Sequence, residues 1–66
     1  MDFENIYTYH APTDDQVVRY KAIREKAKSL AELLDHFCPP SRERSLAQTK
    51  LQEAVMWANA SIAINE

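Results

Sequence analysis

Proline occurs at only two places in this 66-residue chain, and these places divide it into three segments. Pro12 disfavours a helical conformation for the preceding Ala11, and the pair Pro39-Pro40 cannot continue a helix. The long stretches after these prolines contain neither proline nor glycine, so nothing in them interrupts a helix. The sequence therefore predicts a single domain with an extended arm over 1–12, a helix over 13–38, a turn at 39–40 and a second helix over 41–64.

The first predicted helix carries both a start signal and an apolar seam. Thr13 is a favourable N-cap, and Asp14 and Asp15 follow in the first turn, where the helix dipole favours negative charge. Apolar residues then recur at alternating spacings of three and four, as expected for one face of a helix. The seam consists of Tyr20, Ile23, Ala27, Leu30, Leu34 and Phe37, and Leu33 widens it.

The second predicted helix has more apolar surface than one partner helix covers. Ser41 is its expected cap, and Leu51, Val55, Ala58 and Ile62 form one seam, whereas one partner covers a stripe of roughly 100°. The surplus apolar residues are Leu46, Ala47, Ala54, Met56, Trp57, Ala60 and Ile64. We therefore expect an all-α antiparallel two-helix hairpin, assembled into a homo-oligomeric helical bundle that covers this surplus, with Met56 and Trp57 in the interface.

Composition leaves few other ways to stabilise so short a chain. Domains of this size usually gain stability from disulfides, a metal or partner chains. Cys38 is the only cysteine, and together with His10 and His36 it lacks the paired spacing of a zinc site. We expect no metal and no cofactor, which leaves partner chains as the stabilising element.

Simple counts disfavour several functional classes. The formal net charge of −2 argues against binding of long nucleic acid, and the absence of glycine excludes phosphate loops of the P-loop type. Asp2 and Glu4 are atypical of a signal peptide, and no apolar run approaches the roughly 20 residues of a membrane span. We expect a cytosolic protein that does not associate with membranes.

Catalysis is not indicated either. The serines lie on predicted helices or caps with no base near them in sequence, and His10 and His36 stand at opposite ends of the first helix. No nucleophile–base pair forms within one chain. The sequence therefore predicts a protein that is not an enzyme.

A basic cluster in the first helix contrasts with the acidic net charge. Its five cations, which fall within ten residues and are opposed only by Glu25, are Arg19, Lys21, Arg24, Lys26 and Lys28. Such a patch suits a compact anionic ligand, and the alternative is an ordinary solvated helix face. A smaller group around the start of the second helix is either solvated or part of a second basic ring, and consists of Arg42, Arg44 and Lys50.

Aromatic residues of the arm strengthen the first interpretation. Tyr7, Tyr9 and His10 precede Pro12, and aromatic rings beside cations suit nucleotides, because bases stack on rings while Arg and Lys pair with phosphates. The alternative is that Phe3, Ile6 and Tyr7 tether the arm to a neighbouring chain.

Three motifs allow a comparison with a known family. They are Tyr9-His10-Ala11-Pro12, then Ala22-Ile23-Arg24, then the second-helix stretches 41–47 (SRERSLA) and 49–58 (TKLQEAVMWA). Together they resemble the phage anti-CBASS cyclic-nucleotide sponge family, where CBASS is the bacterial cyclic-oligonucleotide-based antiphage signalling system. The similarity runs from about Phe3 over nearly the whole chain, and the second-helix motif is its most specific part.

The resemblance implies a non-enzymatic phage protein in the cytoplasm of the infected bacterial host. Members of the family are helical-hairpin subunits that assemble into homohexamers. They sequester cyclic dinucleotides, and in some cases cyclic trinucleotides, so that the host defence effector is not activated.

The resemblance also implies particular ligand contacts. Tyr9 stands where the family stacks an aromatic ring on a base, and Arg24, fifteen positions later, stands where a basic residue contacts phosphate. Lys26 adds a phosphate contact from another subunit, and His10 and Pro12 accompany Tyr9. A second pocket for cyclic trinucleotides corresponds to the region of Ser45, Gln48 and Thr49.

A second functional hypothesis stays open at the level of sequence. The broad apolar face also suits a helical protein-interaction module, of an antitoxin or adaptor type, that grips a different protein. A DNA-binding regulator is disfavoured by the acidic net charge and by the lack of a short recognition helix.

Overall fold

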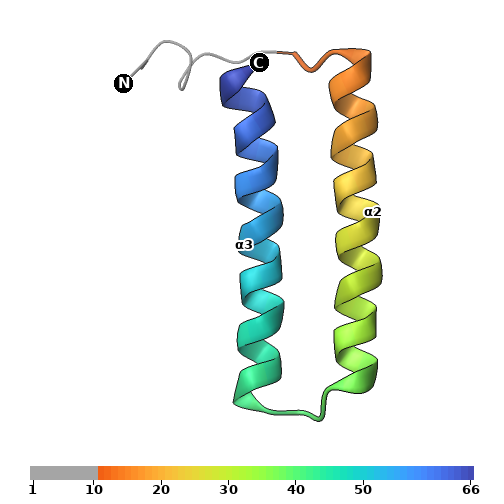
Figure 1. The fold of residues 1–66 in the computed structure, drawn as a ribbon, viewed down its shortest axis with the longest axis vertical. Helices are drawn as coiled ribbons and strands as arrows, with labels where there is room; N and C mark the ends of the chain where they lie inside the picture. Colours follow the sequence, from red (N-terminus) through yellow and green to blue (C-terminus); the bar gives the residue numbers. More distant parts are fainter. Residues whose placement is uncertain (1–10) are drawn as a thin grey trace.

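The structure, a computed structural model, describes residues 11–66. Its two helices, α2 (Asp14–Phe37) and α3 (Arg42–Asn65), are each 24 residues long. They run antiparallel side by side, and residues 38–41 connect them at one end (Figure 1). The predicted all-α two-helix hairpin is thereby confirmed, whereas the expected homo-oligomeric assembly stays a prediction. Of the expected arm, only Ala11 and Pro12 fall within the described residues, and both are non-helical.

The start of α2 is fixed by a reciprocal pair of hydrogen bonds. The Thr13 hydroxyl accepts from the backbone N–H of Gln16 at 3.2 Å, and the Gln16 side-chain oxygen accepts from the backbone N–H of Thr13 at 3.0 Å. This capping box satisfies two of the backbone N–H groups that a helix start leaves unpaired. The predicted cap at Thr13 is confirmed, and Gln16 is a partner that the sequence analysis did not identify.

The turn between the helices is held by Arg44. Ser41 caps α3 by accepting from the backbone N–H of Arg44 at 3.1 Å. The Arg44 guanidinium donates to the Cys38 carbonyl at 3.1 Å and to the Asp35 carbonyl at 3.3 Å, with the Asp35 carboxylate 3.7 Å away. Arg44 therefore bridges the end of α2 and the start of α3. The sequence analysis had expected it either to be solvated or to belong to a second basic ring, and it had not expected this structural role.

The facing seams of the two helices are only partly those expected. All four expected seam residues of α3 are half-buried, and so are Tyr20, Ile23, Ala27 and Leu34 of α2. Leu30, Leu33 and Phe37 are instead 45%, 49% and 72% exposed, while Ala31 is half-buried in line with Ala27. The expectation for Leu30 and Phe37 was wrong, because a strict alternation of three and four drifts about 20° per seven residues around a straight helix. Leu33 was expected only to widen the seam and does not belong to the alternation.

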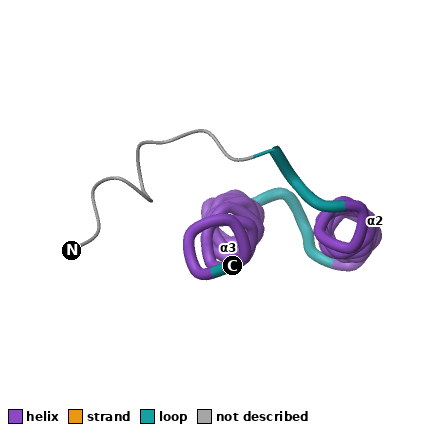
Figure 2. Tube along the Cα trace, turned by 90° about the horizontal axis from the view of Figure 1, so that it is seen from above, coloured by secondary structure: helices purple, strands orange, loops and turns teal. Residues whose placement is uncertain are grey.

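The described residues contain no fully buried side chain. Viewed along the helices, α2 and α3 form a single layer, so no third described element covers either broad side (Figure 2). Met56 and Trp57 are 62% and 69% exposed on the single hairpin. Neither α2 nor α3 has the length and apolar character needed to cross a membrane.

Candidate functional site

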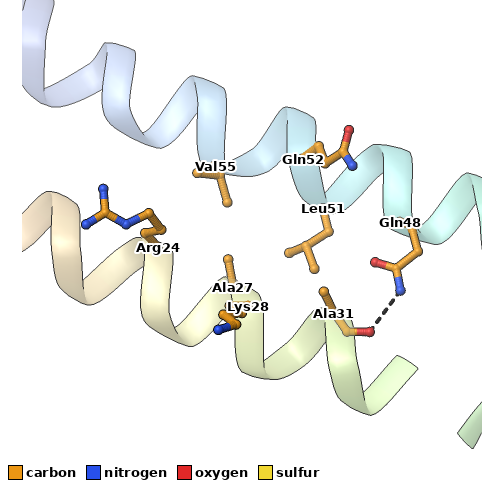
Figure 3. Close-up of a pocket in the computed structure, with 8 residues that line it drawn as sticks. All are labelled: Arg24, Ala27, Lys28, Ala31, Gln48, Leu51, Gln52 and Val55. Atoms are coloured by element: carbon orange, nitrogen blue, oxygen red, sulfur yellow. Dashed lines mark hydrogen bonds between the residues drawn. The ribbon is translucent and has the colours of Figure 1, made fainter. Parts of the chain in front are cut away.

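Each broad side of the hairpin is hollowed between α2 and α3. The first hollow, here the basic groove, has a volume of about 330 Å³ and is lined by Arg24, Ala27, Lys28, Ala31, Gln48, Leu51, Gln52 and Val55 (Figure 3). The second, here the apolar groove, has a volume of about 500 Å³ and is lined by Ala22, Ile23, Lys26, Ala27, Leu30, Leu51, Ala54, Val55 and Ala58.

The two grooves lie on opposite sides of one central row. They share Ala27, Leu51 and Val55, which lie between the helices (Figure 3). Residues two apart on a helix, such as Arg24 and Lys26, are about 200° apart around its axis. The expected phosphate contacts Arg24 and Lys26 therefore line different grooves of the same chain.

The basic groove combines an apolar floor with polar rims. Arg24 and Lys28 line it from α2 at a spacing of four, and Gln48 and Gln52 line it from α3 at the same spacing, so each pair lies on one side of its helix. Neither Arg24 nor Lys28 has an ion-pair partner among residues 11–66. The groove thus offers two unpaired positive charges over an apolar surface.

The other three cations of the basic cluster lie outside the basic groove. Lys21 lies 3.9 Å from Glu25, and Arg19 is engaged by carboxylates at the open end of the hairpin. Lys26 lines the apolar groove as its one charged residue. The five cations that looked like one patch in the sequence are therefore two paired residues, two in the basic groove and one on the far side.

Gln48 is fixed by a bond across the helices. Its side-chain N–H donates to the Ala31 carbonyl at 2.9 Å (Figure 3). Because that carbonyl can only accept, the amide nitrogen must face Ala31, and the amide oxygen is left as an acceptor that makes no hydrogen bond within the described part of the chain. Gln48 therefore presents an amide oxygen, oriented by this bond, at the groove.

The three residues expected in a second pocket do not share one groove. Gln48 lines the basic groove, but Ser45 and Thr49 do not. The Thr49 hydroxyl donates to the Ser45 carbonyl at 3.1 Å, which is the bond to the preceding turn expected for a threonine within a helix. The sequence analysis placed Lys28 in the basic cluster but not among the ligand contacts, and it did not single out Gln52; the spacing of four from Arg24 and from Gln48 was the available signal.

The side of the hairpin that carries the basic groove continues toward the open end. A hollow of about 440 Å³ is lined by Tyr20, Arg24, Asn59, Ala60 and Ala63, and a hollow of about 230 Å³ is lined by Ala11, Pro12, Thr13, Gln16, Tyr20, Ala63 and Glu66. Arg24 lines both the basic groove and the first of these hollows, and Tyr20 lines both hollows. Pro12 and Arg24 thus line neighbouring hollows, while Tyr9 and His10 lie outside the described residues.

A cluster of charged and polar groups closes the open end. The Glu66 carboxylate accepts from Arg19 Nη1 at 2.7 Å, from Arg19 Nη2, and from Gln16 Nε2 at 3.3 Å, and Arg19 Nε lies 3.1 Å from Asp15 Oδ2. These bonds, above all those from Arg19, lower the pKa of Glu66 to about 2, and the Glu66 carboxylate raises the pKa of Arg19. This cluster, here the terminal clasp, ties the first turns of α2 to the end of α3.

Elsewhere several polar side chains of the described residues are engaged in local contacts. No three His, Cys, Asp or Glu side chains between residues 11 and 66 gather closely enough to hold a metal ion. The hydroxyl of Ser29 donates to the Glu25 carbonyl, and that of Ser41 to the Pro39 carbonyl. The His36 ring stands edge-on to Phe37 with ring centres 4.9 Å apart. The chemistry of the site is that of cations, amides and apolar surface.

Comparison with known proteins gives one match. No curated protein and no solved structure matches the chain. The family model described as Acb2/Tad1, hairpin domain, matches residues 2–63, which confirms the resemblance to the anti-CBASS sponge family. The chain belongs to the Acb2/Tad1 hairpin-domain family.

Proposed function

We propose that this protein binds cyclic oligonucleotide second messengers and holds them without cleaving them, so that host CBASS signalling is blocked during phage infection. Cyclic dinucleotides are the first class of ligand, and cyclic trinucleotides are the second. The observation that carries the proposal is the basic groove, in which the unpaired Arg24 and Lys28 stand over an apolar floor in a member of this family. Cations of this kind pair with the phosphodiester oxygens of a ligand, and the apolar surface packs against the faces of its bases.

The contacts that we propose begin with Tyr9 stacked on a base and Arg24 paired with a phosphate. His10 and Pro12 accompany Tyr9, and the neighbouring hollows lined by Pro12 and by Arg24 support a ligand lying along this side of the hairpin. Lys26 lines the opposite groove, so its contact comes from a neighbouring chain. Ser45, Gln48 and Thr49 remain the region proposed for a cyclic trinucleotide.

We further propose that the protein acts as a homo-oligomer, as a hexamer, in the cytoplasm of the infected cell. Two observations support self-association: the absence of fully buried side chains among the described residues, and the apolar groove, which another helix would fill. A cyclic dinucleotide is roughly two-fold symmetric, so two identical chains would supply the same contacts to each half.

The proposal is tested by thermal unfolding with a panel of cyclic di- and trinucleotides, including linkage isomers and cyclic ADP-ribose variants, followed by mass spectrometry of the ligand released on denaturation. We expect a higher unfolding temperature with at least one ligand, because binding to the folded state stabilises it, and release of that ligand intact. Absence of a shift with every ligand at micromolar concentration would refute binding, and release of a cleaved ligand would refute sequestration.

A protein-interaction module is the second candidate, and the exposed Met56 and Trp57 on α3 favour it. Such a module would be poorly behaved or of low order alone and would form a stable complex only with its partner. Size-exclusion chromatography with light scattering separates the two functions, because a discrete, self-complete oligomer supports the sponge.

A further inference from the structure

We propose that the basic groove binds one nucleotide unit of the ligand. Lys28 is a second phosphate contact beside Arg24, and the Gln48 amide oxygen accepts a hydrogen bond from an amino group on the base. This inference rests on the proposed function, and it assigns roles to residues outside the Tyr9–Arg24 set. The juxtaposition that carries it is one groove lined by two cations of α2 and two carboxamides of α3, with apolar residues between them.

Lys28 fits the phosphate role because its charge is available and correctly placed. It lies one helical turn after Arg24 on the same side of α2, so both side chains reach the same rim. No carboxylate of the described residues pairs with Lys28, whereas Lys21 and Lys50 lie 3.9 Å and 3.6 Å from Glu25 and Glu53. Two adjacent unpaired cations suit the diester oxygens of a cyclic nucleotide.

Gln48 fits the base-reading role because its orientation is determined. Its nitrogen lies 2.9 Å from the Ala31 carbonyl, and its oxygen lies on the side of Leu51 (Figure 3). An amide oriented in this way places its acceptor toward the groove, and it therefore favours a base edge that donates, such as the exocyclic amino group of adenine. Leu51 and Val55 provide apolar surface beside it for the face of the base.

The size of the groove agrees with one nucleotide unit per chain. Its volume of about 330 Å³ lies at the lower end of small-molecule sites, which hold roughly 300–1,000 Å³. A whole cyclic dinucleotide exceeds that space. Two chains related by a two-fold axis would each take one half of the ligand, with the Arg24–Lys28 pair of each chain on one phosphate.

The test compares the affinity of wild type, Lys28→Gln and the matched control Lys50→Gln for cyclic di-AMP by isothermal titration calorimetry. Lys50→Gln removes the same charge from a residue that lines neither groove. We expect Lys28→Gln to weaken binding about tenfold or more, as for a lost hydrogen bond to a charged group, and Lys50→Gln to bind as wild type does. Equal affinity of all three proteins would overturn the role of Lys28.

The role of Gln48 is tested by the ratio of affinities for two ligands, which the loss of a purely structural residue would not change. Wild type is titrated with cyclic di-AMP and with its analogue in which purine replaces adenine, and Gln48→Met is titrated with the same pair. We expect wild type to prefer the amino-bearing ligand by about threefold or more, and Gln48→Met to bind both equally. An unchanged preference in Gln48→Met would overturn the base-reading role.

These outcomes are separable from a failure of the proposed function. If wild type binds no cyclic nucleotide of the panel, the function itself fails and this inference fails with it. If wild type binds, and Lys28→Gln and Gln48→Met behave as wild type does, the function stands and the basic groove is not the seat of the ligand.

Discussion

Arg24 and Arg19 are both arginines of α2, but their guanidinium groups have different surroundings. Arg19 is engaged by Glu66 and Asp15, so its charge is already balanced. Arg24 lines two neighbouring hollows and has no ion-pair partner in the part of the chain that the structure describes. The sequence alone does not separate these two residues, because the carboxylate of Glu66 is distant along the chain and reaches Arg19 only through the hairpin.

The first prediction concerns the two residues that lead the proposed binding set. Tyr9→Ala removes a stacking ring and Arg24→Ala removes a charged hydrogen bond, so each should weaken binding of the preferred cyclic nucleotide by at least ~1.5 kcal/mol in calorimetric titration. Arg42→Ala is the matched control, because Arg42 lines neither groove, and it should bind as wild type does. Wild-type affinity in both Tyr9→Ala and Arg24→Ala would show that these two residues do not contact the ligand.

The second prediction concerns the pH dependence of the terminal clasp. The pKa of Glu66 falls from 4.5 to about 2 in the folded protein, so between these values the unfolded chain binds more protons than the folded one. The stabilisation by Glu66 is therefore present above about pH 4.5 and is lost as the pH falls toward 2. Glu66→Gln should unfold at a lower temperature than wild type at pH 7, and the difference should shrink below pH 4.5.

Thermal unfolding of both proteins from pH 2 to pH 7 measures this difference. Glu25→Gln is the control, because within residues 11–66 the Glu25 carboxylate meets only the exposed Lys21, at 3.9 Å. Its unfolding temperature should stay near that of wild type throughout. A difference between Glu66→Gln and wild type that does not change with pH would contradict a role for the ionised carboxylate.

At the scale of the elements, the ends of the helices were more predictable than the faces. Thr13 and Ser41 are caps in the structure as expected, because capping depends on neighbouring residues only. The faces of α2 were partly missed, since Leu30 and Phe37 fit an alternating spacing but drift away from α3. The bond from Gln48 to Ala31 was also missed, because it depends on how far one helix is shifted along the other.

The third prediction tests the cap of α2. Thr13→Ala removes the hydroxyl that accepts from Gln16 and leaves that backbone N–H unpaired, so the free energy of unfolding should fall by about 1 kcal/mol. Thr49→Ala is the matched control, because the Thr49 hydroxyl donates to the Ser45 carbonyl, which already accepts a backbone hydrogen bond within the helix. Urea unfolding measures both, and equal stability of the two variants would contradict the capping role.

At the scale of the whole molecule, the hairpin leaves apolar surface on both α2 and α3. The sequence predicted this surplus because α3 has seven apolar residues outside its seam, and a single partner helix cannot cover them. It did not predict that one side would carry the cations and amides of the basic groove and the other the apolar groove. That division depends on both helices at once, so it becomes visible only when they are placed together.

The fourth prediction assigns the apolar groove to self-association. Leu30 lines that groove and is 45% exposed, so Leu30→Glu should leave the helices of a single chain formed but place a charge where a second chain packs. We expect a smaller mass in light scattering than for wild type, at equal helicity in circular dichroism. Val18→Glu is the control, because Val18 is 65% exposed and lies outside the groove. Wild-type mass for Leu30→Glu would contradict this assignment.

The central claim is that copies of this hairpin share an intact cyclic nucleotide, and the binding stoichiometry in calorimetric titration tests it most directly. With the preferred cyclic dinucleotide, the account predicts saturation at one ligand per two chains, because each chain supplies one Tyr9–Arg24 set to one half of the ligand. No saturable binding of any cyclic dinucleotide, or saturation at one ligand per chain, would contradict it.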